Sequence, residues 1–356
     1  MKYKLSDICF YAKSKIEVSN LTDANYISTE NMLPNKGGIT TASTLPSTIQ
    51  TQAYQKNDVL VSNIRPYFKK IWFAENNGGC SNDVLVLRAK EGIDARFLYY
   101  VLADDAFFDY STATSKGTKM PRGDKAAIMQ YNVPAFDLET QKKIAGLLSD
   151  IDAKIALNIK INENLQQQAQ AIYCDMFITN VNPSWQLGRL SDLITVRYGK
   201  DHKKLADGIY PVYGSGGIMR YVEKPLYDKE SVLIPRKGTL NNVMYVNKPF
   251  WSVDTMFFTE MKLPNVAKFV FHFVKSKDLA SLNTGSAVPS MTTDILNAME
   301  LSIPDANTFY KFENIVAPLY QAMQQNTQES SKLAELRDSL LPRLMSGEID
   351  VTDIDL

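Results

Sequence analysis

Side chains that usually carry catalysis or bind metals are sparse in this chain of 356 residues. It has two histidines, His202 and His272, and neither has a cysteine or glutamate neighbour at the spacing of a metal site. The three cysteines, Cys9, Cys80 and Cys174, are far apart and odd in number, which fits a reducing cytosol without a disulfide framework. No H-E-x-x-H motif and no P-loop occurs. We therefore predict no catalytic residue, no metal site and no bound cofactor.

Two short motifs come close to known nucleotide chemistry. Asn247-Lys-Pro-Phe250 is similar to the Asn-Pro-Pro-Phe tetrad of N6-adenine methyltransferases, but it lacks the first proline. No glycine-rich cofactor loop follows a strand at a suitable place, so a strand and a turn are favoured there. Gly214-Ser-Gly-Gly217 could hold a phosphate through backbone N–H groups, but it lacks the Lys-Ser/Thr ending of a nucleotide site. A contact with a DNA phosphate and a plain tight turn both remain open.

A long helical pattern occurs twice in the chain, over Leu138–Phe177 and Asn307–Leu344, and predicts two helices that pack on each other. The first seam consists of apolar residues in steps of four and three: Ile144, Leu148, Ile151, Ile155, Leu165, Ala169, Ile172 and Met176. The corresponding positions of the second pattern lie 168 residues further along the chain and are Phe312, Val316, Leu319, Met323, Leu333, Arg337, Leu340 and Leu344. Pro318 should start or kink the second helix, because proline removes a helix hydrogen bond.

The predicted helix pair is antiparallel, because a duplicated chain of the order globule, helix, globule, helix places its halves head to tail. Seam residues whose numbers sum to about 488 should then lie side by side. Asn162 is expected beside Asn326 and Asn158 beside Ser330, as polar layers that penalise slipped registers. Arg337 is expected opposite Ile151, which is a poor seam layer. Leu336 is therefore expected to rotate into the seam in place of Arg337.

The segments before the two helices repeat in one order, which indicates a tandem duplication. The clearest echoes are Leu5-Ser-Asp-Ile8 with Leu190-Ser-Asp-Leu193, Asp58–Val61 with Ser231–Ile234, and Phe97–Leu102 with Phe269–Val274. The predicted fold class is α+β, with two duplicated α/β globules on two long antiparallel helices and pseudo-two-fold symmetry. With 45% hydrophobic and 22% charged residues, and no apolar run long enough for a bilayer, we expect a cytoplasmic protein without a membrane partner.

Four stretches carry a resemblance to a known family over essentially the whole chain. They are Val-Pro-Ala-Phe-Asp-Leu-Glu-Thr-Gln-Lys-Lys-Ile-Ala-Gly-Leu-Leu at 133–148, Ile-Asp-Ala-Lys-Ile-Ala-Leu-Asn at 151–158, Gly-Ile-Tyr-Pro-Val-Tyr-Gly-Ser-Gly-Gly at 208–217, and Leu-Leu-Pro-Arg-Leu-Met-Ser-Gly-Glu-Ile at 340–349. The chain resembles the specificity subunits of type I restriction–modification systems. At the second helix it departs from the usual Pro-x-x-Glu-Gln-like entry and has Pro304-Asp-Ala-Asn-Thr-Phe-Tyr.

The resemblance implies target recognition domains at residues 1–135 and 181–304, each reading one half of a split double-stranded DNA site. It implies a central spacer helix at 136–180 and a C-terminal spacer helix with a tail at 305–356. It further implies that the helices dock two methyltransferase (modification) subunits, that restriction/translocase subunits join the full complex, and that catalysis belongs to these partners. The alternative is a self-contained N6-adenine DNA methyltransferase or another DNA-modifying enzyme, against which the missing cofactor loop argues.

Loops that mix basic, polar and aromatic residues are the predicted DNA contacts, because Lys and Arg neutralise phosphates while Asn, Ser, Arg and Tyr can read base edges. Lys+Arg and Asp+Glu both number 39, so any basic surface is local. In the first globule the candidates are Ser62, Asn63, Arg65, Tyr67, Lys69, Lys70, Lys116, Thr118, Lys119 and Arg122. In the second they are Arg197, Tyr198, Lys200, Lys203, Lys204, Ser215, Arg220, Arg236 and Lys237. For each cluster a solvated face is the other interpretation.

Overall fold

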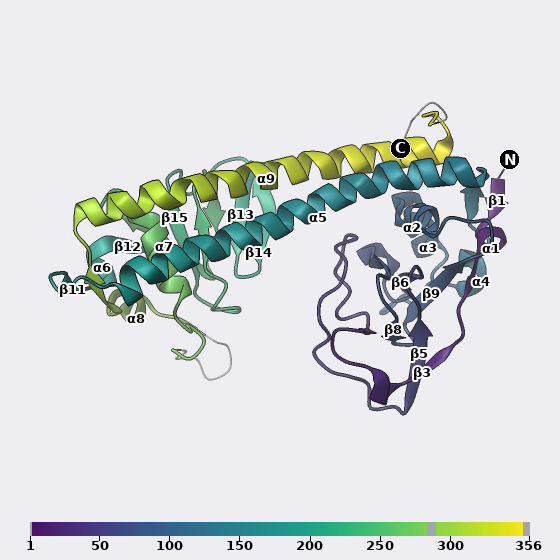
Figure 1. Cartoon of the computed structure of the whole chain (residues 1–356), viewed down its shortest axis with the longest axis horizontal. Helices are drawn as coiled ribbons and strands as arrows, with labels where there is room; N and C mark the ends of the chain where they lie inside the picture. Colours follow the sequence, from purple (N-terminus) through teal and green to yellow (C-terminus); the bar gives the residue numbers. More distant parts are fainter. Residues whose placement is uncertain (1, 283–289, 352–356) are drawn as a thin grey trace. The chain divides into compact units, whose positions relative to one another are not determined.

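The computed structural model describes residues 2–282 and 290–351 and divides into two compact units. Unit 1 combines the chain up to Asn158 with the chain from Thr327 onward, and unit 2 is Ile159–Asn326. Two long helices, α5 (Leu138–Cys174) and α9 (Ala306–Ser346), each contribute one part to each unit (Figure 1). Among the described residues, no helix is long and apolar enough to cross a membrane.

Unit 1 contains two four-stranded sheets, with the orders β2-β9-β6-β7 and β3-β5-β8-β4, and the small pair β1-β10. Its strands are β1 (Lys2–Lys4), β2 (Cys9–Tyr11), β3 (Lys15–Glu17), β4 (Tyr26–Ile27), β5 (Gln50–Tyr54), β6 (Val59–Ser62), β7 (Ile71–Phe73), β8 (Gly78–Cys80), β9 (Val84–Ala89) and β10 (Asn132–Pro134). Its shorter helices are α1 (Leu5–Ile8), α2 (Ala95–Ala103), α3 (Asp105–Ala113), α4 (Lys125–Ile128) and the 3-10 turns η1 (Val18–Asn20) and η2 (Pro66–Phe68).

Unit 2 repeats this plan with the sheets β12-β18-β15-β16 and β14-β13-β17 and the small pair β11-β19. Its strands are β11 (Gln186–Arg189), β12 (Ile194–Tyr198), β13 (Asp207–Gly214), β14 (Gly217–Val222), β15 (Ser231–Pro235), β16 (Met244–Val246), β17 (Trp251–Ser252), β18 (Met256–Met261) and β19 (Glu300–Ile303). Its helices are α6 (Leu190–Leu193), α7 (Ala267–Lys275), α8 (Thr293–Asn297) and the π-helical end of α5, η3 (Asp175–Thr179).

Matching hydrogen bonds show that the two units are copies. The Asp7 carboxylate accepts from the backbone N–H of Lys4 (2.8 Å) at α1, and the Asp192 carboxylate accepts from that of Arg189 (2.7 Å) at α6. Each carboxylate thus satisfies the backbone N–H of the residue that precedes its helix. The predicted duplication is confirmed.

The entries of the two long helices are also alike. Asp137 accepts from the backbone N–H of Thr140 (2.8 Å), and Asp305 accepts from that of Thr308 (2.9 Å). An Asp N-cap thus starts α9 although the Glu-Gln pair of the usual entry is missing. The helix begins at Ala306 and continues through Pro318, so the predicted start at this proline is wrong. Val316 before the proline and Leu319 after it pack in the same core, which holds the helix together across the missing hydrogen bond.

Each globule completes its hydrophobic core with residues of the helix pair. In unit 1, Leu148 of α5 and Leu344 of α9 are fully buried against α2 and the β2-β9-β6-β7 sheet. In unit 2, Ala169 of α5 and Phe312 of α9 are fully buried against α7 and the β12-β18-β15-β16 sheet. Because apolar burial is the main favourable term in folding, the globules and the helices stabilise one another.

The helices run antiparallel within each unit, in the predicted register. In unit 1 the Asn158 amide donates to the Ser330 hydroxyl (3.3 Å) and to the Glu329 carboxylate (2.8 Å). In unit 2 the Asn326 amide donates to the amide oxygen of Asn162 (2.9 Å). The two polar layers are therefore confirmed.

The expectation that Leu336 replaces Arg337 in the seam is wrong, because Leu336 remains 47% exposed. The Arg337 guanidinium instead pairs with Asp152 of α5 (2.7 Å), and the other Asp152 oxygen accepts from the Tyr100 hydroxyl of α2 (2.7 Å). A position that looked like a poor seam layer is thus an ionic connection between α9, α5 and the first globule.

In unit 2, the residue that corresponds to Tyr100 is His272 of α7, and it also binds both long helices. Its Nδ1 lies 2.7 Å from the amide oxygen of Gln170, and its Nε2 lies 2.9 Å from the Tyr320 hydroxyl. Burial, with a smaller contribution from Lys275, lowers the pKa of His272 to about 4, so the ring is neutral at pH 7. A neutral ring fits this site, since Nδ1–H donates to the amide oxygen and Nε2 accepts from the hydroxyl.

A buried ion-pair cluster lies close to this histidine. The Lys268 ammonium of α7 lies 2.6 Å from Glu313 of α9 and 3.1 Å from Glu230, which directly precedes β15. It also faces the rings of Tyr245 and Tyr320 at 5.2 and 5.5 Å from their centroids. Buried charges of this kind are costly unless they are fully paired, so the cluster requires one fixed position of α7 on α9.

Replacing Asn162 and Asn326 by leucine should leave the helix pair as stable or more stable, but should loosen its register, because apolar layers tolerate slippage. Cysteine pairs can measure this. Cysteines at Leu165 and Met323 should cross-link in both backgrounds, and cysteines at Leu165 and Leu319, four residues out of register, only in the double-leucine variant. Absence of the slipped cross-link would contradict the role assigned to the polar layer.

Unit 2 should lose stability as the pH falls from 7 toward 5. The pKa of His272 is lowered to about 4 in the folded chain, whereas it is 6.5 in the unfolded chain. Its contribution to stability is therefore complete above pH 6.5 and decreases below it, because protons then bind more readily to the unfolded chain. The expected loss at pH 5 is on the order of 2 kcal/mol. Urea unfolding can be followed by tryptophan emission in a Trp72→Phe background, which leaves two tryptophans, both in unit 2.

In the same assay, His272→Gln should remove this part of the pH dependence. Tyr320→Phe is the matched control, because it deletes one hydrogen bond but keeps the imidazole. It should lower stability at both pH values by similar amounts. Equal pH dependence of the wild-type chain and the glutamine variant would contradict the assignment.

Candidate nucleic-acid interface

The structure brings together the two predicted contact clusters of unit 1, residues 62–70 and 116–122. Ile64 forms an isolated β-bridge with Arg122, and Arg65 donates its backbone N–H to the carbonyl of Pro121 (2.8 Å). The backbone N–H of Gly123 donates to the Asn63 carbonyl (3.0 Å). Two loops that are far apart in the sequence therefore form one surface.

The first of these loops has an unusual backbone. Arg65 and Lys69 both adopt left-handed conformations, with φ of 49° and 51°, on either side of η2. Such conformations are unfavourable for residues other than glycine and often occur at functional sites. They leave Tyr67 and Phe68 47% and 39% exposed, so two aromatic rings stand in solvent beside basic residues. Among the described residues, the buried Nε of Arg65 has no hydrogen-bond partner.

Part of the positive charge in this cluster is already paired with carboxylates. Lys69 and Lys36 both contact Asp105 (3.0 and 2.8 Å), and Arg122 contacts Asp83 (3.0 Å). Burial disfavours the Asp105 carboxylate, but the two ammonium groups outweigh this effect and lower its pKa.

Other members of the cluster are also engaged or reach solvent. The Lys70 ammonium donates to the Thr29 carbonyl (2.6 Å), and Lys116 pairs with Asp124 (2.5 Å). Thr118 and Lys119 are exposed, whereas Ser62 is buried and bonds to the Ile64 carbonyl (3.1 Å). The surface is thus less basic than its sequence indicates.

Unit 2 builds the equivalent surface from the loop after β15. The backbone N–H of Met291 donates to the Arg236 carbonyl (2.9 Å), and Lys237 forms an isolated β-bridge with Ser290. These contacts repeat those of Asn63 and Ile64 in unit 1. The Arg236 guanidinium lies 5.3 Å from the ring centroid of the exposed Tyr198. The structure therefore brings Tyr198 and Arg236 together, with Lys237 next to Arg236.

The glycine-rich motif is a hairpin turn beside this surface. Gly214 pairs with Gly217 at the end of β13 and β14, so Ser215 and Gly216 form a two-residue connection. The Asn242 amide donates to the Ser215 carbonyl (2.8 Å), which ties the turn to the loop after β15. The tight-turn interpretation is confirmed, and a role in phosphate binding stays a prediction.

The remaining basic residues of unit 2 that were predicted to contact DNA divide into two groups. Arg197 pairs with Glu260 (3.0 Å), and Arg220 binds the Asp207 carboxylate (2.9 Å) and a carbonyl oxygen, so both are engaged internally. The exposed ones are Lys200, Lys203 and Lys204.

The motifs considered for catalysis have structural roles. Phe250 is fully buried in a core cluster, and the Asn247 amide donates to Gln324 of α9 (3.2 Å). A buried ring cannot stack on a nucleobase, so Asn247–Phe250 does not form a base-modifying site. Burial raises the pKa of both Cys9 and Cys80 to about 12, which makes these thiols unreactive. Over residues 2–282 and 290–351, no cluster of His, Cys, Asp and Glu could hold a metal ion.

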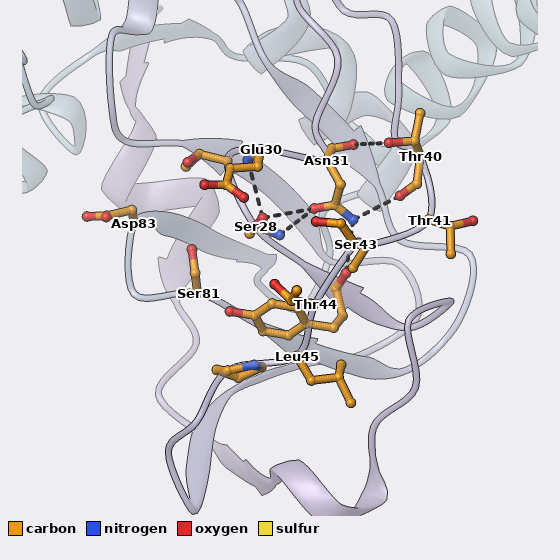
Figure 2. Close-up of a pocket in the computed structure, with 14 residues that line it drawn as sticks. Ser28, Glu30, Asn31, Thr40, Thr41, Ser43, Thr44, Leu45, Ser81 and Asp83 are labelled. Atoms are coloured by element: carbon orange, nitrogen blue, oxygen red, sulfur yellow. Dashed lines mark hydrogen bonds between the residues drawn. The ribbon is translucent and has the colours of Figure 1, made fainter. Parts of the chain in front are cut away.

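A polar pocket of about 500 Å³ borders the unit 1 interface, and the sequence interpretation did not include it. Figure 2 shows the hydroxyl side chains of Thr40, Thr41, Ser43 and Thr44 around it, together with Glu30 and Asp83. Asn31 holds the loop, because its amide donates to the Thr40 carbonyl (2.9 Å) and accepts from the backbone N–H of Ser28 (2.6 Å). The serine- and threonine-rich run Thr40-Thr-Ala-Ser-Thr44 was the signal that could have revealed it.

Two copies of one α+β module, each with basic and aromatic loops and each completed by a long helix pair, define a duplicated recognition protein. The family described as type I restriction modification DNA specificity domain matches residues 1–167 and again residues 182–336. The chain belongs to this family and contains its domain twice.

Relatives of known type resemble the chain along its length. The type I restriction enzyme HindI specificity subunit of Haemophilus influenzae is 22% identical, over 98% of this chain and 99% of the relative. The MjaIX specificity subunit of Methanocaldococcus jannaschii is 22% identical, over 74% of this chain and 71% of that protein. The crystal structure of a type I restriction–modification S subunit from M. genitalium shares the fold, with a TM-score of 0.59 at 18% identity, over 97% of this chain and 96% of that one.

Replacing Asp105 by asparagine should strengthen binding of duplex DNA, because it releases the ammonium groups of Lys36 and Lys69. Each phosphate newly neutralised steepens the slope of log affinity against log salt by about 0.9, so a change of up to about 2 is expected. Asp109→Asn is the matched control, because it removes the same charge from an exposed position of α3. Identical slopes for the two variants would place Lys36 and Lys69 outside the interface.

Proposed function

We propose that the chain is the DNA-reading specificity subunit of a type I restriction–modification complex, in which each globule reads one half of a bipartite site. The observation that carries this proposal is that the loop after β6, at residues 63–64, and the loop after β15, at residues 236–237, make matching backbone contacts within the predicted contact surface of each copy. Each surface belongs to one copy of the matched family domain. Two related surfaces with different side chains fit two half-sites of different sequence.

The long helices are the proposed spacer between the two recognition domains. Modules on one face of a duplex tend to sit about one helical turn, ~10 base pairs, apart. With half-sites of ~3–4 base pairs, the unread gap would be on the order of 6 base pairs. The proposed boundaries are 1–135 and 181–304 for the recognition domains, and 136–180 and 305–356 for the helices and tail.

The helices also offer surfaces for partners. Leu157 and Ile159 of α5 are 51% and 53% exposed, and Ile315 of α9 is also exposed. Exposed apolar residues of this kind favour protein contacts. We assign these helices to two methyltransferase subunits, with restriction/translocase subunits joining the assembly in the cytoplasm. The subunit itself is then non-catalytic, in keeping with the structural role of Asn247–Phe250.

Co-expression with a candidate methyltransferase partner should produce a methylated motif with two defined halves and an unread gap. A heptad inserted at matched positions beside Asn158 and Ser330 keeps the seam in register and adds about 10 Å of helix. Genome methylation mapping should then show a longer gap between unchanged half-sites.

A seven-residue insertion after Asn182, in the connection between η3 and β11, is the control and should leave the gap unchanged. A single continuous motif in the wild-type map would contradict the bipartite model.

A further inference from the structure

A second hollow in unit 1 has the opposite electrostatic character to the hydroxyl-lined pocket. This lysine groove, of about 380 Å³, lies between the connection from β2 to β3, strand β5 and the start of α4. Its polar rim consists of Lys13, Lys15, Gln50, Asn82 and Lys125. We propose that the lysine groove binds DNA, with the ammonium groups on phosphates and the two amides on base edges. The inference rests on the proposed function and adds a contact surface to it.

Charge separates the two hollows. The lysine groove is lined by three lysines and no carboxylate, whereas the hydroxyl pocket is lined by Glu30 and Asp83 and no basic residue. Lys13, Lys15 and Lys125 are exposed, and within residues 2–282 and 290–351 none of them has an ion-pair partner. The electrostatic free energy of binding an anion is therefore more favourable in the lysine groove than beside Lys69 or Arg122, because neighbouring carboxylates already offset the charge of those two residues.

The walls of the lysine groove are held by hydrogen bonds that leave its rim free. The Gln52 amide donates to the Ala12 carbonyl (2.9 Å), and the backbone N–H of Ala53 donates to the carbonyl of Ser14 (2.8 Å). The Tyr11 hydroxyl donates to the Lys125 carbonyl (3.0 Å) and so connects β2 to α4. A preformed site loses less conformational entropy on binding than a flexible one.

The duplication provides independent support for this location. Cys9 pairs with Ala89 at the start of β2, as Ile194 pairs with Met261 at the start of β12. Lys13 and Lys15 therefore occupy the places of Tyr198 and Lys200 in the second copy. The run Arg197–Lys204 was predicted as a DNA contact in unit 2, whereas Lys13 and Lys15 were not among the predicted contacts of unit 1.

The lysine groove also adjoins the unit 1 interface already described. Asn82 lines it, and the next residue, Asp83, pairs with Arg122 and accepts from the backbone N–H of Asn63 (2.8 Å). Lys125 directly follows Asp124, the partner of Lys116. An extended polyanion such as a duplex can contact both surfaces. The exposed amides of Gln50 and Asn82 suit adenine, because an amide can donate to N7 and accept from N6.

The test uses a double variant that carries both Lys13→Gln and Lys15→Gln. This variant and the wild-type chain are each co-expressed with the methyltransferase. Binding of a random-sequence duplex is measured against salt, and methylated sites are mapped. The double variant should bind at least tenfold more weakly at low salt, with a salt slope shallower by about 2, because two phosphate contacts are lost. The methylated motif should stay the same, because phosphate contacts do not select sequence.

Lys56→Gln with Lys90→Gln is the matched control, since it removes two exposed lysines of unit 1 outside both the lysine groove and the long helices. Asn82→Ala should relax one position in one half of the motif and leave the other half unchanged. Equal affinity and slope in the groove and control variants would overturn the proposal. So would loss of the methyltransferase from the groove variant with DNA binding unchanged, which would make the lysine groove a protein contact. A wild-type complex without a split motif would instead refute the proposed function.

Discussion

The seam between α5 and α9 is the constraint on which both units depend. Neither globule closes its core without it, because Leu148 and Leu344 complete the core of unit 1, and Ala169 and Phe312 that of unit 2. Along most of its length the seam obtains its free energy from apolar burial, which does not specify register well. The amides at its polar layers supply that specificity, since every slipped register would place an amide against leucine.

The two copies use different chemistry to hold their globules at equivalent places. In unit 1 the hydroxyl of Tyr100 meets an Asp152–Arg337 ion pair, whereas in unit 2 the neutral ring of His272 bridges Gln170 and Tyr320. Both units therefore have a polar connection at this place, but the groups that donate and accept its hydrogen bonds differ. A polar contact at this place therefore serves to orient the globule, because apolar packing alone permits rotation and sliding. The His272 bridge is the one that depends on pH, through the lowered pKa of its ring.

The proposed recognition of DNA depends on where positive charge remains unpaired rather than on how much basic sequence is present. The residues that stand out in the sequence, such as Lys69 and Arg122, pair with nearby carboxylates. Lys69 directly follows the exposed aromatic residues Tyr67 and Phe68. The lysine groove, which contains no carboxylate, offers its positive charge to solvent and to an anion. The two surfaces adjoin in unit 1. The loops at residues 62–70 and 116–122 present exposed aromatic rings, and the neighbouring lysine groove presents unpaired positive charge.

The sequence by itself determined the duplication, the antiparallel register of Asn158 and Asn162 with their partners, and the family. These features follow from periodicities and spacings that are visible in the sequence alone. The tertiary structure decided that Arg337 forms an ion pair across the seam and that Pro318 lies within a continuous helix, because packing against neighbours outweighs a local preference. It also decided which lysines pair with carboxylates among the described residues. Asp105 reaches Lys36 and Lys69 only in the folded chain, and pairing between residues so far apart in sequence leaves no trace in local composition.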